Sequence, residues 1–148
     1  MLRRALAALS LLALVSLACA SARSEVGSAP PPGADPDAES LEVTATAYNS
    51  VPGQTWGDPA LTAWGDRLEP GMRALAVSRD LIALGLDHGA EVRIEGMPGT
   101  WRVLDKLHRR WTRRIDLYMG EDVQAAREFG KRQVRIYWVR DAAAHGGP

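Results

Sequence analysis

The stretch VLDKLHRRWTRRIDLYMG, residues 103–120, places two aspartates, Asp105 and Asp116, eleven positions apart with a cluster of basic residues between them. Within RIDLY, residues 114–118, apolar and polar side chains alternate with a period of two, which is typical of a half-buried β-strand. The apolar side chains of such a strand face the core. We therefore expect the carboxylate of Asp116 to face solvent or a groove.

Asp105 ends the run WRVLD, residues 101–105, and shares its parity with Trp101 and Val103. A continued strand would aim its carboxylate along the apolar side. A half-buried carboxylate must be hydrogen-bonded, ion-paired or protonated, and the nearest cations are those of Lys106, Arg109 and Arg110. Two interpretations follow from the pattern: a functional carboxylate pair, or a structural ion pair at the rim of a barrel.

The rest of the chain favours a small β domain. Further alternating runs predict strands over residues 41–48, 91–95, 100–104 and 133–139, with Trp101 and Trp138 in the core. Residues 120–130, which begin with acidic side chains and end at Gly130, predict an amphipathic helix. Residues 78–86 predict one further helical turn capped by Ser78. Several short strands with few helices favour a mainly β, closed barrel whose interior is filled by side chains, so a ligand must lie outside it, under loops such as residues 49–66.

The ends of the chain are expected to lie outside this domain. Residues 1–20 combine early arginines, an apolar run and small residues, as in a secretory signal, and the run is too short to span a bilayer comfortably. Cleavage is expected after Ala20, or before Cys19 if that thiol carries a lipid. Residues 21–40 are rich in proline and predict a disordered linker, residues 41–140 one domain, and residues 141–148 a disordered tail.

Charge and residue content narrow the function. Residues 41–140 contain 15 Lys and Arg against 13 Asp and Glu, so global charge selects no partner. The basic cluster around Trp111 would suggest phosphate binding in a cytosolic protein, but export excludes nucleic acid and leaves peptidoglycan or lipopolysaccharide as polyanions. A solvated basic loop is the alternative. The three histidines lack metal-ligand spacing, no G-x-S-x-G motif occurs, and the single cysteine lies in the export segment, so we expect no metal, no cofactor, and no serine or cysteine nucleophile.

The chain resembles the 3D (Asp-Asp-Asp) domain family. The similarity covers nearly all of residues 41–140 and is carried by VTATAYN, TAWGD, AVSRDLIALGL, IDLYMG, AAREFG and VRIYWV. That family is similar to the barrel of membrane-bound lytic transglycosylase A and to RlpA-like proteins, which implies a six-stranded double-psi β-barrel with one or two short helices. By this resemblance Asp116 matches the catalytic acid and Asp105 its supporting aspartate. Ser78 stands where the family has its first aspartate, and Asp80 follows two residues later.

One segment departs from the family pattern. Where the family has Thr-Gly-Gly after the first aspartate of the pair, this chain has Lys106, Leu107 and His108, followed by more bulky basic residues. Glycines let a ligand approach the backbone closely, whereas these side chains shape or block the approach. The departure favours a subgroup with an altered substrate, or one that binds without cutting.

Two functions therefore stand as hypotheses. The first is an exported lytic transglycosylase that cleaves peptidoglycan glycan strands, with Asp116 as acid and base. The second is a non-catalytic murein-binding or envelope-scaffold module on the same barrel. In either case we expect a monomer in the periplasm or on the outer membrane, attached to a membrane only through a lipid at Cys19. The expected substrate-binding residues are Tyr48, Trp64, Asp80, Arg109, Arg110 and Tyr118; for the tyrosines the alternative is core packing, and for Trp64 an anchor for its loop.

Overall fold

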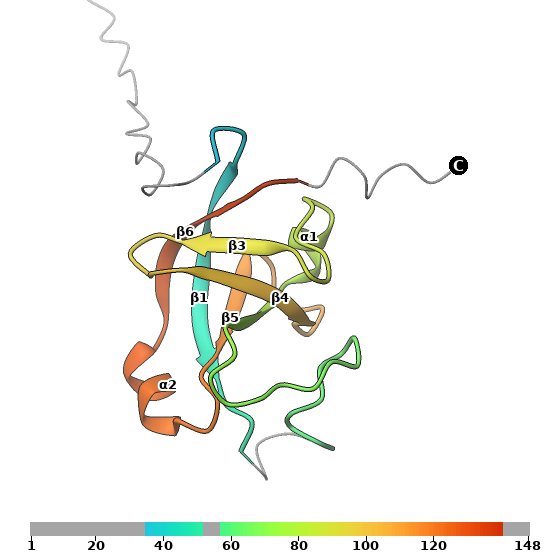
Figure 1. Ribbon diagram of the computed structural model, residues 1–148, viewed down its shortest axis with the longest axis vertical. Helices are drawn as coiled ribbons and strands as arrows, with labels where there is room; N and C mark the ends of the chain where they lie inside the picture. Colours follow the sequence, from blue (N-terminus) through green and yellow to red (C-terminus); the bar gives the residue numbers. More distant parts are fainter. Residues whose placement is uncertain (1–34, 52–56, 141–148) are drawn as a thin grey trace, which may run out of the picture.

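Six strands close into a barrel in the computed structural model, which describes residues 35–51 and 57–140. Neighbouring strands follow the order β1-β5-β2-β4-β3-β6. Figure 1 shows β3 and β4 crossing over β1 and β5. The elements are β1 (Glu39–Tyr48), β2 (Ala74–Val77), α1 (Arg79–Ile82), β3 (Glu91–Ile94), β4 (Thr100–Lys106), β5 (Arg114–Tyr118), α2 (Val123–Phe129) and β6 (Arg132–Trp138). The predicted fold class, a mainly β barrel of six strands with two short helices, is confirmed.

Two ψ motifs give the barrel its topology. β1 pairs with β5 in parallel and β5 pairs with β2 in antiparallel fashion, so β1 and β2 run in opposite directions with β5 between them. β4 and β5 flank β2 in the same way. The β1–β2 loop and the β4–β5 loop therefore each pass over an intervening strand. These two crossings define the double-psi barrel, and they bring the two loops to the strands that carry Asp105 and Asp116.

The core follows the alternation read from the sequence. Inward-facing side chains of all six strands, with Leu81, Leu86 and Phe129, form one buried cluster, which includes Trp101 and Trp138 as predicted. The sequence pattern did not predict β2, because all four residues of ALAV are buried and show no alternation of apolar and polar side chains. β1 begins at Glu39, two residues before the strand predicted from Leu41.

Both predicted helices form, but α2 begins at Val123, after the predicted start at residue 120, and the cap of α1 differs. In α2 the carboxylate of Asp122 accepts the N–H of Ala125 at 2.8 Å, and Gly130 ends the helix with a φ of 62°, where a side chain would be strained. Ser78 precedes α1, but its side chain makes no capping bond. Its hydroxyl instead accepts the N–H of Arg114 at 3.0 Å, so Ser78 ties the start of β5 to the end of β2.

Several predictions fall outside the described residues: the signal at residues 1–20, the lipidated Cys19, most of the linker, and the tail from residue 141. Across residues 35–51 and 57–140, no helix combines the length and the apolar content needed to span a bilayer.

Candidate functional site

Asp105 and Asp116 lie in one row on the outer face of the barrel. The row runs across four neighbouring strands, since Thr46 pairs with Asp116, Asp116 with Ala76, and Ala76 with Asp105. Residues at the same level of paired strands project from the same face. Ala76 is small and 3% exposed, so the two carboxylates flank a side chain that fills little space.

The predicted orientation of Asp105 was wrong because β4 contains a bulge. Leu75 pairs with Val103, but the next residue, Ala76, pairs with Asp105, so Leu104 is an extra residue in β4. A bulge of this kind shifts the alternation by one position. Leu104 packs with outer-face residues such as Tyr118, and Asp105, which by parity would face inward, joins the outer row instead.

Asp116 is half-buried and has one hydrogen-bond donor among the described residues. The hydroxyl of Thr46 donates to its Oδ1 at 2.7 Å. Burial raises the pKa of Asp116 above its ordinary value, the Thr46 hydrogen bond and the charge of Arg114 oppose this, and the negative charge of Asp105 adds to it. The net direction is upward. No Lys, Arg or His of the described residues forms an ion pair with this carboxylate.

Asp105 is held by backbone rather than by cations. Its Oδ1 accepts the N–H of Ala63 and its own neighbour's N–H, that of Lys106, both at 2.7 Å. Lys106, one of the three cations expected to neutralise Asp105, instead places its ammonium 4.6 Å from the ring centroid of Trp64. The interpretation of Asp105 as half of an ion pair finds no partner in the described part of the chain.

Two tyrosines lie beside the carboxylates. The rings of Tyr48 and Tyr118 are 5.5 Å apart between centroids, and the hydroxyl of Tyr118 shares a 2.7 Å hydrogen bond with that of Ser50. The hydroxyl of Tyr48 is buried without a partner among the described residues. Burial, with the charges of Asp105, Asp116 and Tyr118, raises the pKa of Tyr48 far above its usual range. Tyr48 is therefore a neutral phenol close to both carboxylates.

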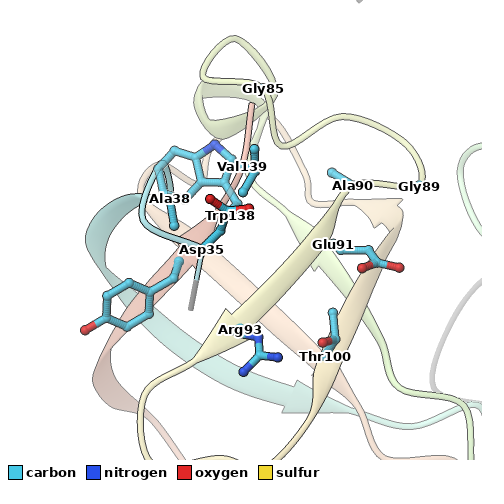
Figure 2. A pocket seen from close by; sticks show the side chains of 11 residues that line it. Asp35, Ala38, Gly85, Gly89, Ala90, Glu91, Arg93, Thr100, Trp138 and Val139 are labelled. Carbon is cyan, nitrogen blue, oxygen red and sulfur yellow. The ribbon is translucent and has the colours of Figure 1, made fainter. Parts of the chain in front are cut away.

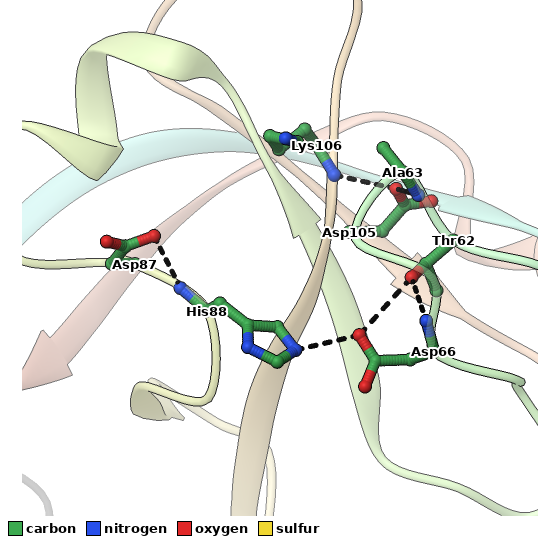
Figure 3. A network of polar contacts seen from close by, with 7 residues as sticks. All are labelled: Thr62, Ala63, Asp66, Asp87, His88, Asp105 and Lys106. Carbon is green, nitrogen blue, oxygen red and sulfur yellow. Dashed lines mark hydrogen bonds and ion pairs between the residues drawn. The ribbon is translucent and has the colours of Figure 1, made fainter.

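A polar network fixes the part of the β1–β2 loop that reaches Asp105 (Figure 3). The imidazole Nε2 of His88 lies 2.7 Å from Asp66, whose Oδ2 also accepts the hydroxyl of Thr62 at 3.3 Å. The ring of Trp64 packs against the barrel core and lies 5.2 Å from that of His88. The network anchors the loop on both sides of Ala63, the residue that donates its N–H to Asp105.

The β4–β5 loop carries the basic cluster. Arg109 and Arg110 are exposed, and the guanidinium carbon of Arg110 lies 4.7 Å from the ring centroid of Trp111. On the same ring the guanidinium of Arg114 lies 4.0 Å away. Asp80, expected at the substrate, accepts the backbone N–H of Arg113 at 2.8 Å and so holds the end of this loop.

Two pockets lie apart from the carboxylate row. One, about 530 Å³, is lined by residues of β3, β6 and the segment before β1, among them Glu91, Arg93 and Trp138 (Figure 2). The other, about 320 Å³, lies where residues 71–73, 97–98 and 118–120 meet. Neither is lined by Asp105 or Asp116. No group of His, Cys, Asp and Glu suited to a metal ion occurs within the described ranges.

Sequence reasoning missed the residues that link these parts. The alternation in TATAY, residues 44–48, could have identified Thr46 as an outward-facing residue. It lies on the same face of the sheet as Asp116 of the neighbouring strand. The hydrogen bond from Ala63 to Asp105 joins residues 42 positions apart, and no pattern in the sequence predicts it. Trp56, a second tryptophan of the same loop by sequence, lies outside the described residues.

Comparison with solved structures shows a distant structural likeness. No family model matches the chain, and no curated protein matches it. Among solved structures, the apo form of an expansin from Clavibacter michiganensis is similar, with a TM-score of 0.48 and 24% sequence identity over 74% of this chain. The match spans 54% of that expansin, so this chain corresponds to about half its length.

Proposed function

We propose that the protein is an exported enzyme that cleaves peptidoglycan glycan strands in the manner of a lytic transglycosylase, with Asp116 as acid and base. The observation that carries this proposal is the environment of Asp116: a half-buried carboxyl on the outer face of the barrel, with a raised pKa and no ion pair in the described part of the chain. A raised pKa keeps a larger fraction of the carboxyl protonated near neutral pH, as a general acid requires.

The reaction needs only one such group. The protonated carboxyl of Asp116 gives its proton to the oxygen between muramic acid and glucosamine as that bond breaks. The resulting carboxylate then takes the proton of the muramic C6 hydroxyl, which attacks the same sugar and closes an anhydro ring. Because the nucleophile is part of the substrate, no water has to be positioned. Asp105, fixed by two backbone N–H groups, contributes the negative charge that favours the protonated form of Asp116.

Membership of the 3D domain family is part of the same proposal. The spacing of Asp105 and Asp116 and their common row support it, while the bulky residues after Asp105 distinguish this chain from the family pattern. The proposal places the protein in the periplasm or on the outer membrane, with Cys19 as the site of lipidation if the chain is anchored.

The direct test is digestion of purified murein sacculi, with mass spectrometry of the released muropeptides. The wild-type chain should release anhydro-muropeptides, and Asp116→Asn should lose about 10²- to 10⁴-fold of that rate, the usual contribution of a general acid. Glu69→Gln removes an exposed carboxylate of the β1–β2 loop and is the matched control. Absence of anhydro products from the wild type, or unchanged release by Asp116→Asn, would reject the enzymatic proposal.

A second function, binding of murein without cleavage, is favoured by the exposed Arg109 and Arg110, of which Arg110 lies over the ring of Trp111. Cationic side chains next to an aromatic ring suit a glycan that carries peptide carboxylates. Co-sedimentation with sacculi tests this function. If the wild type binds without forming product, and the double variant Arg109→Ala/Arg110→Ala loses binding, the scaffold function replaces the enzymatic one.

A further inference from the structure

Arg114 and Asp116 lie two residues apart on the same face of β5, yet they do not pair. Two residues of a strand span roughly 7 Å, a distance that an arginine side chain can bridge. A direct guanidinium–carboxylate contact is a strong interaction, particularly for a half-buried carboxylate. Other contacts must therefore keep the guanidinium of Arg114 away from the carboxyl of Asp116.

Two contacts hold Arg114 elsewhere. Its Nε and Nη2 donate to the hydroxyl oxygen of Thr46 at 3.3 and 3.0 Å, and its guanidinium carbon lies 4.0 Å from the ring centroid of Trp111. The hydroxyl of Thr46 in turn donates to Asp116 at 2.7 Å. A chain of contacts thus runs from Trp111 through Arg114 and Thr46 to the carboxyl of Asp116.

The backbone of Arg114 is fixed as well. Its N–H donates to the hydroxyl of Ser78 at 3.0 Å, and its carbonyl accepts the N–H of Ser78 at 2.9 Å. The preceding residue, Arg113, has a φ of 46°, and its N–H is bound by Asp80. With the backbone pinned, the direction of the Arg114 side chain depends on its contacts with Thr46 and Trp111.

We propose that Trp111 is a positioning residue that keeps the hydroxyl of Thr46 between Arg114 and Asp116, and so keeps Asp116 available as an acid. This inference rests on the proposed function of Asp116. It gives the bulky β4–β5 loop, which replaces a glycine-containing segment of the family pattern, a role in tuning the acid of this chain.

The groups that face Asp116 determine the direction in which each substitution should shift its pKa. They are Arg114 on its own strand, Thr46 and Tyr48 on β1, and Asp105 on β4 across Ala76, whereas β2 contributes no charge. Arg114→Gln removes a positive charge and should raise the pKa of Asp116. Trp111→Ala leaves that charge in place but releases it to pair with the carboxylate, and should lower the pKa.

The test is a carbon-detected NMR titration of the Asp116 carboxyl in the full chain, with sacculus digestion across pH as a second readout. Trp111→Ala should shift the titration of Asp116 to lower pH and move the loss of product release to lower pH with it. Trp111→Phe retains an aromatic face and should restore most of the wild-type behaviour. Arg110→Gln removes a cation from the same tryptophan without touching Thr46, and should leave the titration in place.

A double-mutant cycle separates this role from a general loosening of the loop. In the Arg114→Gln background, Trp111→Ala should have no further effect on the pKa of Asp116. An equal shift in both backgrounds, or a shift of the single Trp111→Ala variant to higher pH, would overturn the proposal. Because the titration does not depend on activity, it decides the role of Trp111 even if the wild type releases no anhydro product, the result that would reject the enzymatic function.

Discussion

Asp105 and Asp116 occupy the same row of the barrel on either side of Ala76, yet different kinds of hydrogen-bond donor hold their carboxylates. Two backbone N–H groups hold Asp105, that of Ala63 in the β1–β2 loop and that of Lys106 at the end of β4. A single side-chain hydroxyl holds Asp116, whose burial raises its pKa. Two carboxylates whose environments differ in this way can divide the roles of supporting charge and proton donor.

The largest expected effect separates the two carboxylates by activity. Asp116→Asn should lose about 10²- to 10⁴-fold of the rate of anhydro-muropeptide release, whereas Asp105→Asn should lose less because it removes only a supporting charge. Rates measured on sacculi at several pH values check this. Equal losses for both variants would mean that the two carboxylates act as a pair and not in separate roles.

The second prediction concerns the stability of the fold, for which Asp105 is expected to matter more than Asp116. Asp105→Ala removes the acceptor of two backbone N–H groups, and hydrogen bonds to charged groups contribute about 1.5–3 kcal/mol each, less where water can replace the acceptor. Since Ala63 is exposed, we expect a total loss of about 1–3 kcal/mol in the free energy of unfolding. Asp116→Asn should lose much less in the same urea titration. A larger loss for Asp116→Asn would assign it a structural role.

The two tyrosines extend the comparison to uncharged groups. Tyr118→Phe breaks the hydrogen bond with Ser50 and should lower the free energy of unfolding by about 1 kcal/mol. Tyr48→Phe removes a buried hydroxyl that has no partner among the described residues, and should be neutral or stabilising. Thermal unfolding of both variants beside the wild type tests the contrast. A clear destabilisation by Tyr48→Phe would show that its hydroxyl has a partner.

The smallest expected effect is a pH dependence of stability. Because the pKa of Asp116 is raised in the folded state, the folded chain binds this proton more tightly than the unfolded chain. Its stabilising contribution is complete below about pH 4, near the pKa of an unfolded aspartate, and is lost as pH rises through the folded pKa. Asp116→Asn cannot ionise, so its stability relative to the wild type should increase from acid to neutral pH. A constant difference would contradict the raised pKa.

The β4–β5 stretch shows how far sequence reasoning reaches. Alternation in RIDLY predicted both strand β5 and the outward carboxylate of Asp116, because a strand buried on one face must repeat every two residues. The same rule failed two positions beyond Val103, since one extra residue in β4 turned Asp105 to the other face. The failure lies in the bulge, which is set by pairing with β2 and leaves no signature in the residues themselves.

In the basic β4–β5 loop, too, one feature was predictable from the sequence and another was not. Its composition predicted an exposed cationic surface, and Arg109 and Arg110 are exposed. That Arg114 turns back to Thr46 and stacks on Trp111 depends on a residue 68 positions away, so it follows from strand pairing and not from local spacing.

By itself the amino-acid sequence determined the class of fold, the core, the end of α2 at Gly130, and that Asp116 faces outward, because each depends on periodicity or on a cap within a few residues. Only the tertiary structure decided that Asp105 joins Asp116, that Ala63 holds one and Thr46 the other, and that Arg114 stays off the acid. These contacts join residues tens of positions apart through two crossing loops, and their geometry exists only once the barrel has closed.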